Sequence, residues 1–238
     1  MARRTKEEAL ATRHRLLDAA ELLFQAQGVS QTSLQQIAQQ AGATRGAIYW
    51  HFKDKADLFN AMMERVTLPF EAATRAAGNT DQDPLAELEH AIVGMLRRTA
   101  SDAQVRGVFD NATHVVEYTG ELASLRQRHL TARDACVSDF ARALAHAARQ
   151  AAVRLPMPAR AAAQGMHALL SGLVQNWLLE PGAFELASAG RRCLRVYLAG
   201  LGFGDNGGLP RRPPRRVAQP ETTLSRCIST DRIRPSEG

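Results

Sequence analysis

The sequence predicts an all-α protein with a three-helix N-terminal head on a larger helical body, about nine helices in total. Apolar residues recur at spacings of three and four along most of the chain, and no run alternates with the period of a strand. Glycine and proline punctuate these runs where helices are expected to end. We divide the 238 residues into a head, 1–54, a body, 55–204, and a tail, 205–238.

The first helix of the head is expected at about 7–27. Gly28 ends it, because glycine readily adopts the left-handed conformation that stops a helix. One apolar face of this helix is left for burial and consists of Leu16, Leu17, Ala20, Leu23 and Phe24.

The segment 32–55 has the pattern of a helix-turn-helix, whose second helix enters the major groove of DNA. Ser33 and Gln36 have the spacing of a capping box, Gly42 supplies the turn, and Thr44 caps the second helix. The apolar residues that pack these two helices are Leu34, Ile37, Ala38, Ala41, Ala47 and Ile48. An ordinary helical hairpin that binds nothing fits the same pattern.

The outward residues of this segment are the candidate DNA contacts. We expect Arg45, Tyr49 and Trp50 near bases or the sugar-phosphate chain, and Gly46 would let the backbone approach closely. Phosphate contacts and a mobile basic arm would position the protein without reading bases. The candidates for these roles, with the capping residues, are Arg3, Arg4, Thr32, Ser33, Thr44, His51, Lys53 and Lys55.

Two runs carry a family resemblance: MARRTKEEALATRHRLLDAAELLFQAQGV, and TSLQQIAQQAGATRGAIYWHFKDKADLF after it. They resemble the N-terminal domain of the TetR family of transcriptional repressors, in particular the AcrR-like and TtgR-like regulators of multidrug efflux. A weaker likeness continues through HVVEYTGEL (114–122) and SGLVQNWLLEP (171–181), and it stops near Gly202. The resemblance implies a dimeric, DNA-binding repressor that responds to a ligand.

The body begins with a fourth helix near residue 56, which is expected to run past Pro69 with some distortion. Asp83-Pro84 starts the next helix, because proline suits a first helical turn. A long helix is expected over about 121–153. The last two helices, at about 158–180 and 183–202, are divided by the turn dipeptide Pro181-Gly182.

From Asp205 onward the chain is rich in glycine, proline and arginine without periodicity, so we expect 205–238 to be disordered. Of the formal net charge of +6, the tail contributes +3, from seven Arg and four Asp/Glu. Residues 1–60 have eight Lys/Arg and six Asp/Glu and contribute +2. Nonspecific DNA binding by the tail is the alternative to a solvated tail without function.

The last two helices contain small and apolar residues that fit either an internal core or a dimer face. The resemblance favours the dimer, because TetR-type repressors pair through these helices into a four-helix bundle. A two-fold dimer would also place two recognition helices on successive major-groove turns of a palindromic site. The candidate dimer residues are Gly165, Leu169, Gly172, Leu173, Leu194, Tyr197 and Leu198.

The other body helices are expected to enclose a ligand pocket. Methionine and aromatic side chains suit varied apolar ligands, since they can repack, although each one alone fits a plain core better than a ligand contact. His114 and Glu117 are polar residues in an apolar segment and would need partners or a ligand if buried. The candidate pocket residues are Met62, Met63, Phe70, Ile92, Leu96, Phe109, Thr113, His114, Glu117, Cys136, Phe140, Met166, Leu170 and Trp177.

The function predicted is a ligand-responsive, homodimeric transcriptional repressor that binds double-stranded operator DNA. By resemblance, small hydrophobic or cationic drug-like ligands would release it from the operator of a multidrug efflux operon. We expect no cofactor, no metal, no membrane partner and a cytoplasmic protein with reduced cysteines. An enzyme built on His114, Glu117 and Cys136 is one rival, although no catalytic motif is present. A ligand-independent architectural DNA-binding protein is the other.

Overall fold

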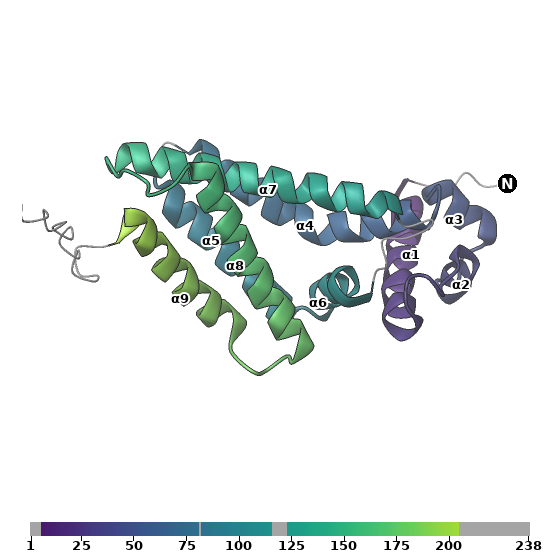
Figure 1. Cartoon of the computed structure of the whole chain (residues 1–238). Helices are drawn as coiled ribbons and strands as arrows, with labels where there is room; N and C mark the ends of the chain where they lie inside the picture. Colours follow the sequence, from purple (N-terminus) through teal and green to yellow (C-terminus); the bar gives the residue numbers. More distant parts are fainter. Residues whose placement is uncertain (1–5, 81, 116–122, 205–238) are drawn as a thin grey trace, which may run out of the picture. The chain divides into compact units, whose positions relative to one another are not determined.

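The computed structural model describes residues 6–80, 82–115 and 123–204 (Figure 1). These ranges contain nine α-helices, two short π-helical turns and no β-strand, which confirms the predicted all-α class. None of the helices described there is long and apolar enough to cross a membrane. Arg3, Arg4, Glu117 and the expected disordered tail lie outside the described residues.

The head contains α1 (Lys6–Gln27), α2 (Leu34–Gln40) and α3 (Arg45–His51). Gly28 has a φ of +85°, and its amide donates to the carbonyl of Phe24, so α1 ends where the sequence predicts. The three helices share a core with the start of the fourth helix. Its fully buried side chains include Leu16, Leu17, Phe24, Ile37, Ile48, Phe52 and Leu58.

The fourth helix, α4 (Lys55–Asn79), continues through Pro69 as the sequence predicts. Its first half belongs to the core of the head, where Met62 is fully buried. Its second half packs against α5 and α7, and Ala77 belongs to a second core in the body. The fourth helix therefore contributes to both cores, as does the helix that contains Leu125, in the core of the head, and Val137, in the core of the body.

The body is built on pairs of long helices. Figure 1 shows α7 running beside α4, and contacts also join α7 to α8, α8 to α9, and α5 to α9. The short α6 packs against α1, α4, α5 and α8. The elements are α5 (Pro84–Ser101), α6 (Ala103–Asp110), η1 (Asn111–Val115), α7 (Ala123–Gln150), α8 (Ala159–Leu179), α9 (Leu186–Leu198) and η3 (Ala199–Phe203).

Candidate nucleic-acid interface and cavity

The α2–turn–α3 unit is stabilised by hydrogen bonds that its own sequence provides. Ser33 and Gln36 form the reciprocal capping box at the start of α2. Gly42 has a φ of +61°, and the amide of Ala43 donates to the carbonyl of Ala38, which closes the C-terminal turn. Thr44 Oγ1 accepts from the amide of Ala47 and caps α3. The predicted caps and turn are confirmed.

The outward face of α3 carries large side chains that the core does not use. Tyr49 is 50% exposed and Trp50 is 73% exposed, while the intervening face buries Ile48 completely. The guanidinium of Arg45 lies over the Tyr49 ring, 5.8 Å from its centroid. The second helix of the helix-turn-helix therefore presents an aromatic and basic surface to solvent. Gly46 is exposed on the same face.

Two of the candidate phosphate contacts are occupied inside the protein. Lys55 is 7% exposed, and its Nζ donates to the carbonyls of Thr32 and Ser30 at 2.9 and 3.2 Å. Thr32 is 1% exposed, and its hydroxyl donates to the carbonyl of Gly28 at 2.7 Å. These side chains fix the loop between α1 and α2 and are not presented to DNA.

The remaining candidates lie at or near the surface. Ser33, Thr44 and Lys53 are exposed, and His51 is half-buried with its ring edge-on to the Trp50 ring at 4.5 Å. The hydroxyls of Ser33 and Thr44 are already used in the caps. Lys53 is therefore the lysine near α3 that presents its charge to solvent in the part of the head described by the structure.

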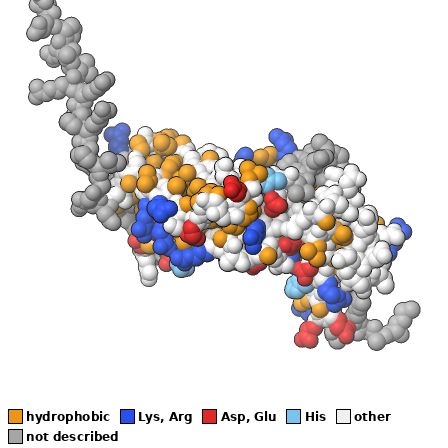
Figure 2. Space-filling model, turned by 90° about the horizontal axis from the view of Figure 1, so that it is seen from below, with side chains coloured by type: hydrophobic (Ala, Val, Ile, Leu, Met, Phe, Trp, Pro, Cys, Tyr) orange, Lys and Arg blue, Asp and Glu red, His pale blue; other side chains and the backbone are white. Residues whose placement is uncertain are grey.

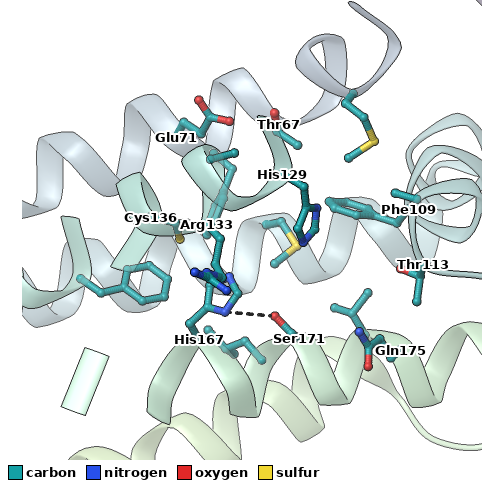
Figure 3. A pocket seen from close by; sticks show the side chains of 18 residues that line it. Thr67, Glu71, Phe109, Thr113, His129, Arg133, Cys136, His167, Ser171 and Gln175 are labelled. Carbon is teal, nitrogen blue, oxygen red and sulfur yellow. Dashed lines mark hydrogen bonds between the residues drawn. The ribbon is translucent and has the colours of Figure 1, made fainter. Parts of the chain in front are cut away.

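A cavity of about 390 Å³ lies in the body between α4, α5, α6, η1, α7 and α8 (Figure 3). The exposed residues that line it are His129 and Ala132 of α7 and Gln175 of α8, so the cavity opens between these helices. The predicted pocket residues that line it are Met63, Phe70, Phe109, Thr113, Cys136, Phe140 and Leu170.

Other predicted pocket residues lie elsewhere. His114 is exposed, and its Nδ1 lies 2.8 Å from a carboxylate oxygen of Asp110. Glu117 lies outside the described residues. The indole of Trp177 donates to the carbonyl of Phe184 in the body core. The others are fully buried in the two cores, because their helices turn them toward neighbouring helices: Met62, Ile92, Leu96 and Met166.

Sequence reasoning missed most of the polar cavity wall. His129 and Arg133 fall on the same stripe of α7 as Cys136 and Phe140, and polar groups on an apolar stripe are a usable signal of a cavity. His167 has no such mark in the sequence. The polar lining residues not predicted are Thr67, Glu71, His129, Arg133, His167, Ser171 and Gln175.

Cys136 does not behave as a nucleophile in this cavity. Burial, together with the negative charges of Asp139 and Glu71, raises the pKa of its thiol to about 12. The reactive form of cysteine is the thiolate, which is scarce at neutral pH under these conditions. His114, the other described member of the hypothetical catalytic cluster, lies outside the cavity wall. The two residues are not assembled into a catalytic site.

The candidate dimer residues divide between the inside and the outside of the chain. Leu194 and Leu198 are buried in the body core. Tyr197 packs over Gly165 of α8, and its hydroxyl donates to the carbonyl of Ala162 at 2.8 Å. Leu169, Gly172 and Leu173 are half-buried.

The most exposed apolar side chains of α8 and α9 were not among these candidates. Leu179 is 71% exposed and Val196 is 73% exposed. Figure 2 shows hydrophobic side chains gathered on the side of the body where α8 and α9 lie. Periodicity alone does not tell which side of these helices faces the core.

Several known proteins are similar to this chain in both sequence and fold. The model of bacterial regulatory proteins of the tetR family matches residues 16–62, and the C-terminal region of MAATS-type transcriptional repressors matches residues 83–203. The HTH-type transcriptional regulator AcrR of Shigella flexneri is 37% identical over 206 residues, which cover 83% of this chain and 93% of that protein.

Two solved structures are also similar to this chain in fold. NalD, the secondary repressor of the MexAB-OprM multidrug efflux pump in Pseudomonas aeruginosa, superposes with a TM-score of 0.74 at 34% identity, covering 82% of this chain and 98% of its own. SmeT of Stenotrophomonas maltophilia, in complex with triclosan, gives 0.73 at 30% identity, covering 86% and 99%. Since the helix-turn-helix head, the helical body and the sequence all agree with these proteins, the chain is a member of the TetR family of transcriptional repressors.

Proposed function

We propose that this repressor binds a palindromic operator as a homodimer and leaves it when a hydrophobic ligand fills the cavity. The genes under its control are proposed to include a multidrug efflux operon, as for NalD. Release is a population shift, in which the ligand must favour the spacing of the two heads that does not fit DNA. A tenfold loss of operator affinity needs about 1.4 kcal/mol of coupling.

The observation that carries this proposal is the position of α4. Met62 lies in the core of the head, whereas Thr67, Phe70 and Glu71 on the same helix line the cavity. With a rise of 1.5 Å per residue, Met62 and Phe70 are only about 12 Å apart along the axis. A ligand that displaces the cavity wall therefore acts on the helix that supports α2 and α3.

Polar contacts also join α4 to the head. Arg65 of α4 lies 2.6 Å from a carboxylate oxygen of Asp18 and 3.2 Å from one of Glu21, both on α1. Gln104 of α6 donates to the same oxygen of Asp18 at 3.0 Å. Movement of α4 or α6 is thereby coupled to α1 through directional contacts.

The dimer is proposed to form through the exposed side of α8 and α9. The bond from Tyr197 to Ala162 holds the two helices together, so that they can act as one face. A two-fold pair would place the two α3 helices on half-sites about 34–36 Å apart. Leu179 and Val196 would lose exposed apolar area in such an interface.

The apolar wall of the cavity suits hydrophobic drug-like ligands. Its methionine and aromatic side chains can repack around different shapes. Glu71 supplies a carboxylate among the lining residues, and a cationic group on a ligand would meet it. Hydrophobic and cationic ligands are therefore proposed as inducers.

Selection of DNA fragments with the purified full-length protein, followed by mobility-shift titration, tests the function. We expect one palindromic sequence to be enriched and a hydrophobic dye to weaken its complex. Tyr49→Ala should reduce operator affinity at least about tenfold while the oligomeric state is unchanged, since loss of a base or sugar contact costs about 1–3 kcal/mol. Enrichment of no sequence, together with no effect of any dye, would support a ligand-independent architectural protein instead.

A further inference from the structure

The end of the cavity between α7 and α8 is chemically different from the rest. His129 and Arg133 are four residues apart on α7, and His167 and Ser171 are four apart on α8, so each pair shares one helix face. Figure 3 shows these four side chains along the cavity wall, with Nδ1 of His167 3.4 Å from Oγ of Ser171. Two imidazoles and one guanidinium therefore line this end of a cavity whose other lining residues are mostly apolar.

The pKa of each imidazole is lowered from its ordinary value. Partial burial of the ring is the largest cause that lowers the pKa of His129, and the positive charge of Arg133 is the second. For the pKa of His167, burial again comes first, followed by the charges of Arg133 and His129. Each group makes protonation of the next less favourable, and a negative charge placed among them would reverse this effect.

The other charged groups around the cavity do not supply that negative charge. Asp134 accepts from Nε and Nη2 of Arg133 at 3.2 and 2.8 Å, but this pair is partly exposed and contributes at most about 1 kcal/mol. Glu71 on α4 raises the pKa of Cys136 and Asp139 and is not among the causes that shift either histidine.

Within the described part of the chain, the remaining elements that line the cavity add no charged side chain at this end. From α5 the lining residue is Met95, and from α6 and η1 they are Phe109, Ala112 and Thr113. Gln175 of α8 adds a neutral amide near the opening. Among the residues that the structure describes, the positive charge of Arg133 faces two carboxylates, its partly exposed partner Asp134 and Glu71 on α4.

We propose that this end of the cavity is a subsite for an anionic head group, such as the carboxylate of an aromatic acid, held by Arg133, His129 and His167. The rest of the ligand would lie against the apolar wall. Binding draws protons from solvent onto the histidines, so affinity for an ionised ligand increases as the pH falls from 8 to 6. The proposal rests on the cavity being the ligand site of the repressor, and it adds a class of ligand beyond the hydrophobic and cationic ones.

Three probes of one shape separate the possibilities: 2-naphthoate, 2-naphthamide and 2-naphthylmethylammonium. Binding to the full-length protein is measured by calorimetry at pH 7 in phosphate and in Tris, whose ionisation enthalpies differ. We expect naphthoate to bind at least about tenfold more tightly than the amide, since charge-assisted hydrogen bonds are the stronger kind. Its binding enthalpy should depend on the buffer in the direction of proton uptake, while that of the amide should not.

Substitutions in the full-length protein test which residues cause the tighter binding of naphthoate and its proton uptake. Arg133→Gln should weaken the affinity for naphthoate by at least about tenfold and leave the affinity for naphthamide unchanged. His167→Gln should reduce the proton uptake. Arg126→Gln is the matched control, because Arg126 is an exposed arginine of α7 outside the cavity lining. It should bind all three probes like the native protein.

Equal affinities for naphthoate and naphthamide in the native protein would overturn the anionic subsite and leave the cavity as a hydrophobic site. Preference for the ammonium probe would overturn it in favour of recognition by Glu71. Absence of binding by all three probes would count against the subsite and the ligand function together. Release of operator DNA by naphthamide alone would support the repressor function while rejecting the subsite.

Discussion

Lys55 shows how one side chain at the start of α4 supports the DNA-binding head. Its ammonium satisfies the carbonyls of Ser30 and Thr32, and the residue is buried. We expect Lys55→Met, which keeps the apolar stem, to lower the free energy of unfolding by about 1–3 kcal/mol. Operator affinity should fall in parallel, while the dependence of log K on log salt keeps its slope, because Lys55 neutralises no phosphate.

Lys53→Met is the matched control for this prediction. Lys53 is exposed, and its backbone amide, which donates to Asp57, is kept in the variant. Stability in urea should be unchanged, and the salt slope should become shallower by about one unit, as expected when one phosphate is no longer neutralised. The assignment fails if Lys55→Met makes the salt slope shallower and leaves the stability intact.

Glu21, at the contact between α1 and α4, is expected to make the stability of the protein depend on pH. Burial is the main cause that raises its pKa from 4.5 to about 7, against the lowering effect of Arg65. Because the folded state binds the proton more tightly than the unfolded state, this group makes stability fall as the pH rises from about 4.5 to 7. Glu21→Gln should remove about 2 kcal/mol of the stability that the native protein loses between pH 5.5 and 8.

Urea unfolding of the native protein and the variant at both pH values provides the measurement for Glu21. Glu7→Gln, an exposed carboxylate of the same helix, should keep the native pH dependence. A decrease in stability that persists in full in Glu21→Gln would assign the pH dependence to other groups.

At the scale of single residues, the sequence predicts those contacts that join residues close together in the chain. The capping box of Ser33 and Gln36 and the cap of Thr44 join residues three apart and form as expected. The hydrogen bond from Lys55 to Thr32 spans 23 residues, and no local pattern separates it from a lysine facing DNA.

At the scale of elements, α8 and α9 decide whether the protein can pair. Val196 is 73% exposed on α9, while Leu194 two residues earlier is fully buried in the chain's own core. We expect Val196→Glu to give a folded monomer, since it places a charge in the proposed interface without touching the core. Operator affinity should fall by at least about a hundredfold, because a monomer can occupy only one half-site.

Sedimentation and circular dichroism separate the two outcomes for Val196. Leu68→Glu, at a 54% exposed position of α4, is the control and should remain dimeric. Val196→Glu that stays dimeric would place the interface on another face of the body.

The sequence predicts the helices better than it predicts which side of each helix faces the core. Continuation of α4 past Pro69 and the turn at Pro181-Gly182 follow from the chain, and both are present. The cavity cannot be predicted from the sequence in the same way. Ile92 and Phe140 are both apolar and both belong to the body core, yet only Phe140 of the two also lines the cavity, because an empty space is a property of several helices together.

At the scale of the whole molecule, the contact of Arg65 with Asp18 and Glu21 is the place where ligand and DNA binding are expected to be coupled. Removing Arg65 alone would take away the charge that lowers the pKa of buried Glu21, so stability would change together with the coupling. The double variant Arg65→Met/Glu21→Gln removes both charges. It should bind operator and ligand separately with affinities near the native values.

The ligand should then no longer weaken operator binding in this double variant. The ratio of operator affinities without and with saturating ligand, expected near ten in the native protein, should fall toward one. Arg191→Met/Glu89→Gln removes the ion pairs of Glu89 on α5 with Arg191 and Arg195 on α9, far along the chain from the head, and should keep the native ratio. Since coupling is reciprocal, titrating ligand in the presence of operator must give the same ratio. A full native ratio in Arg65→Met/Glu21→Gln would show that packing of α4 against α1 and α6, without these charges, carries the signal.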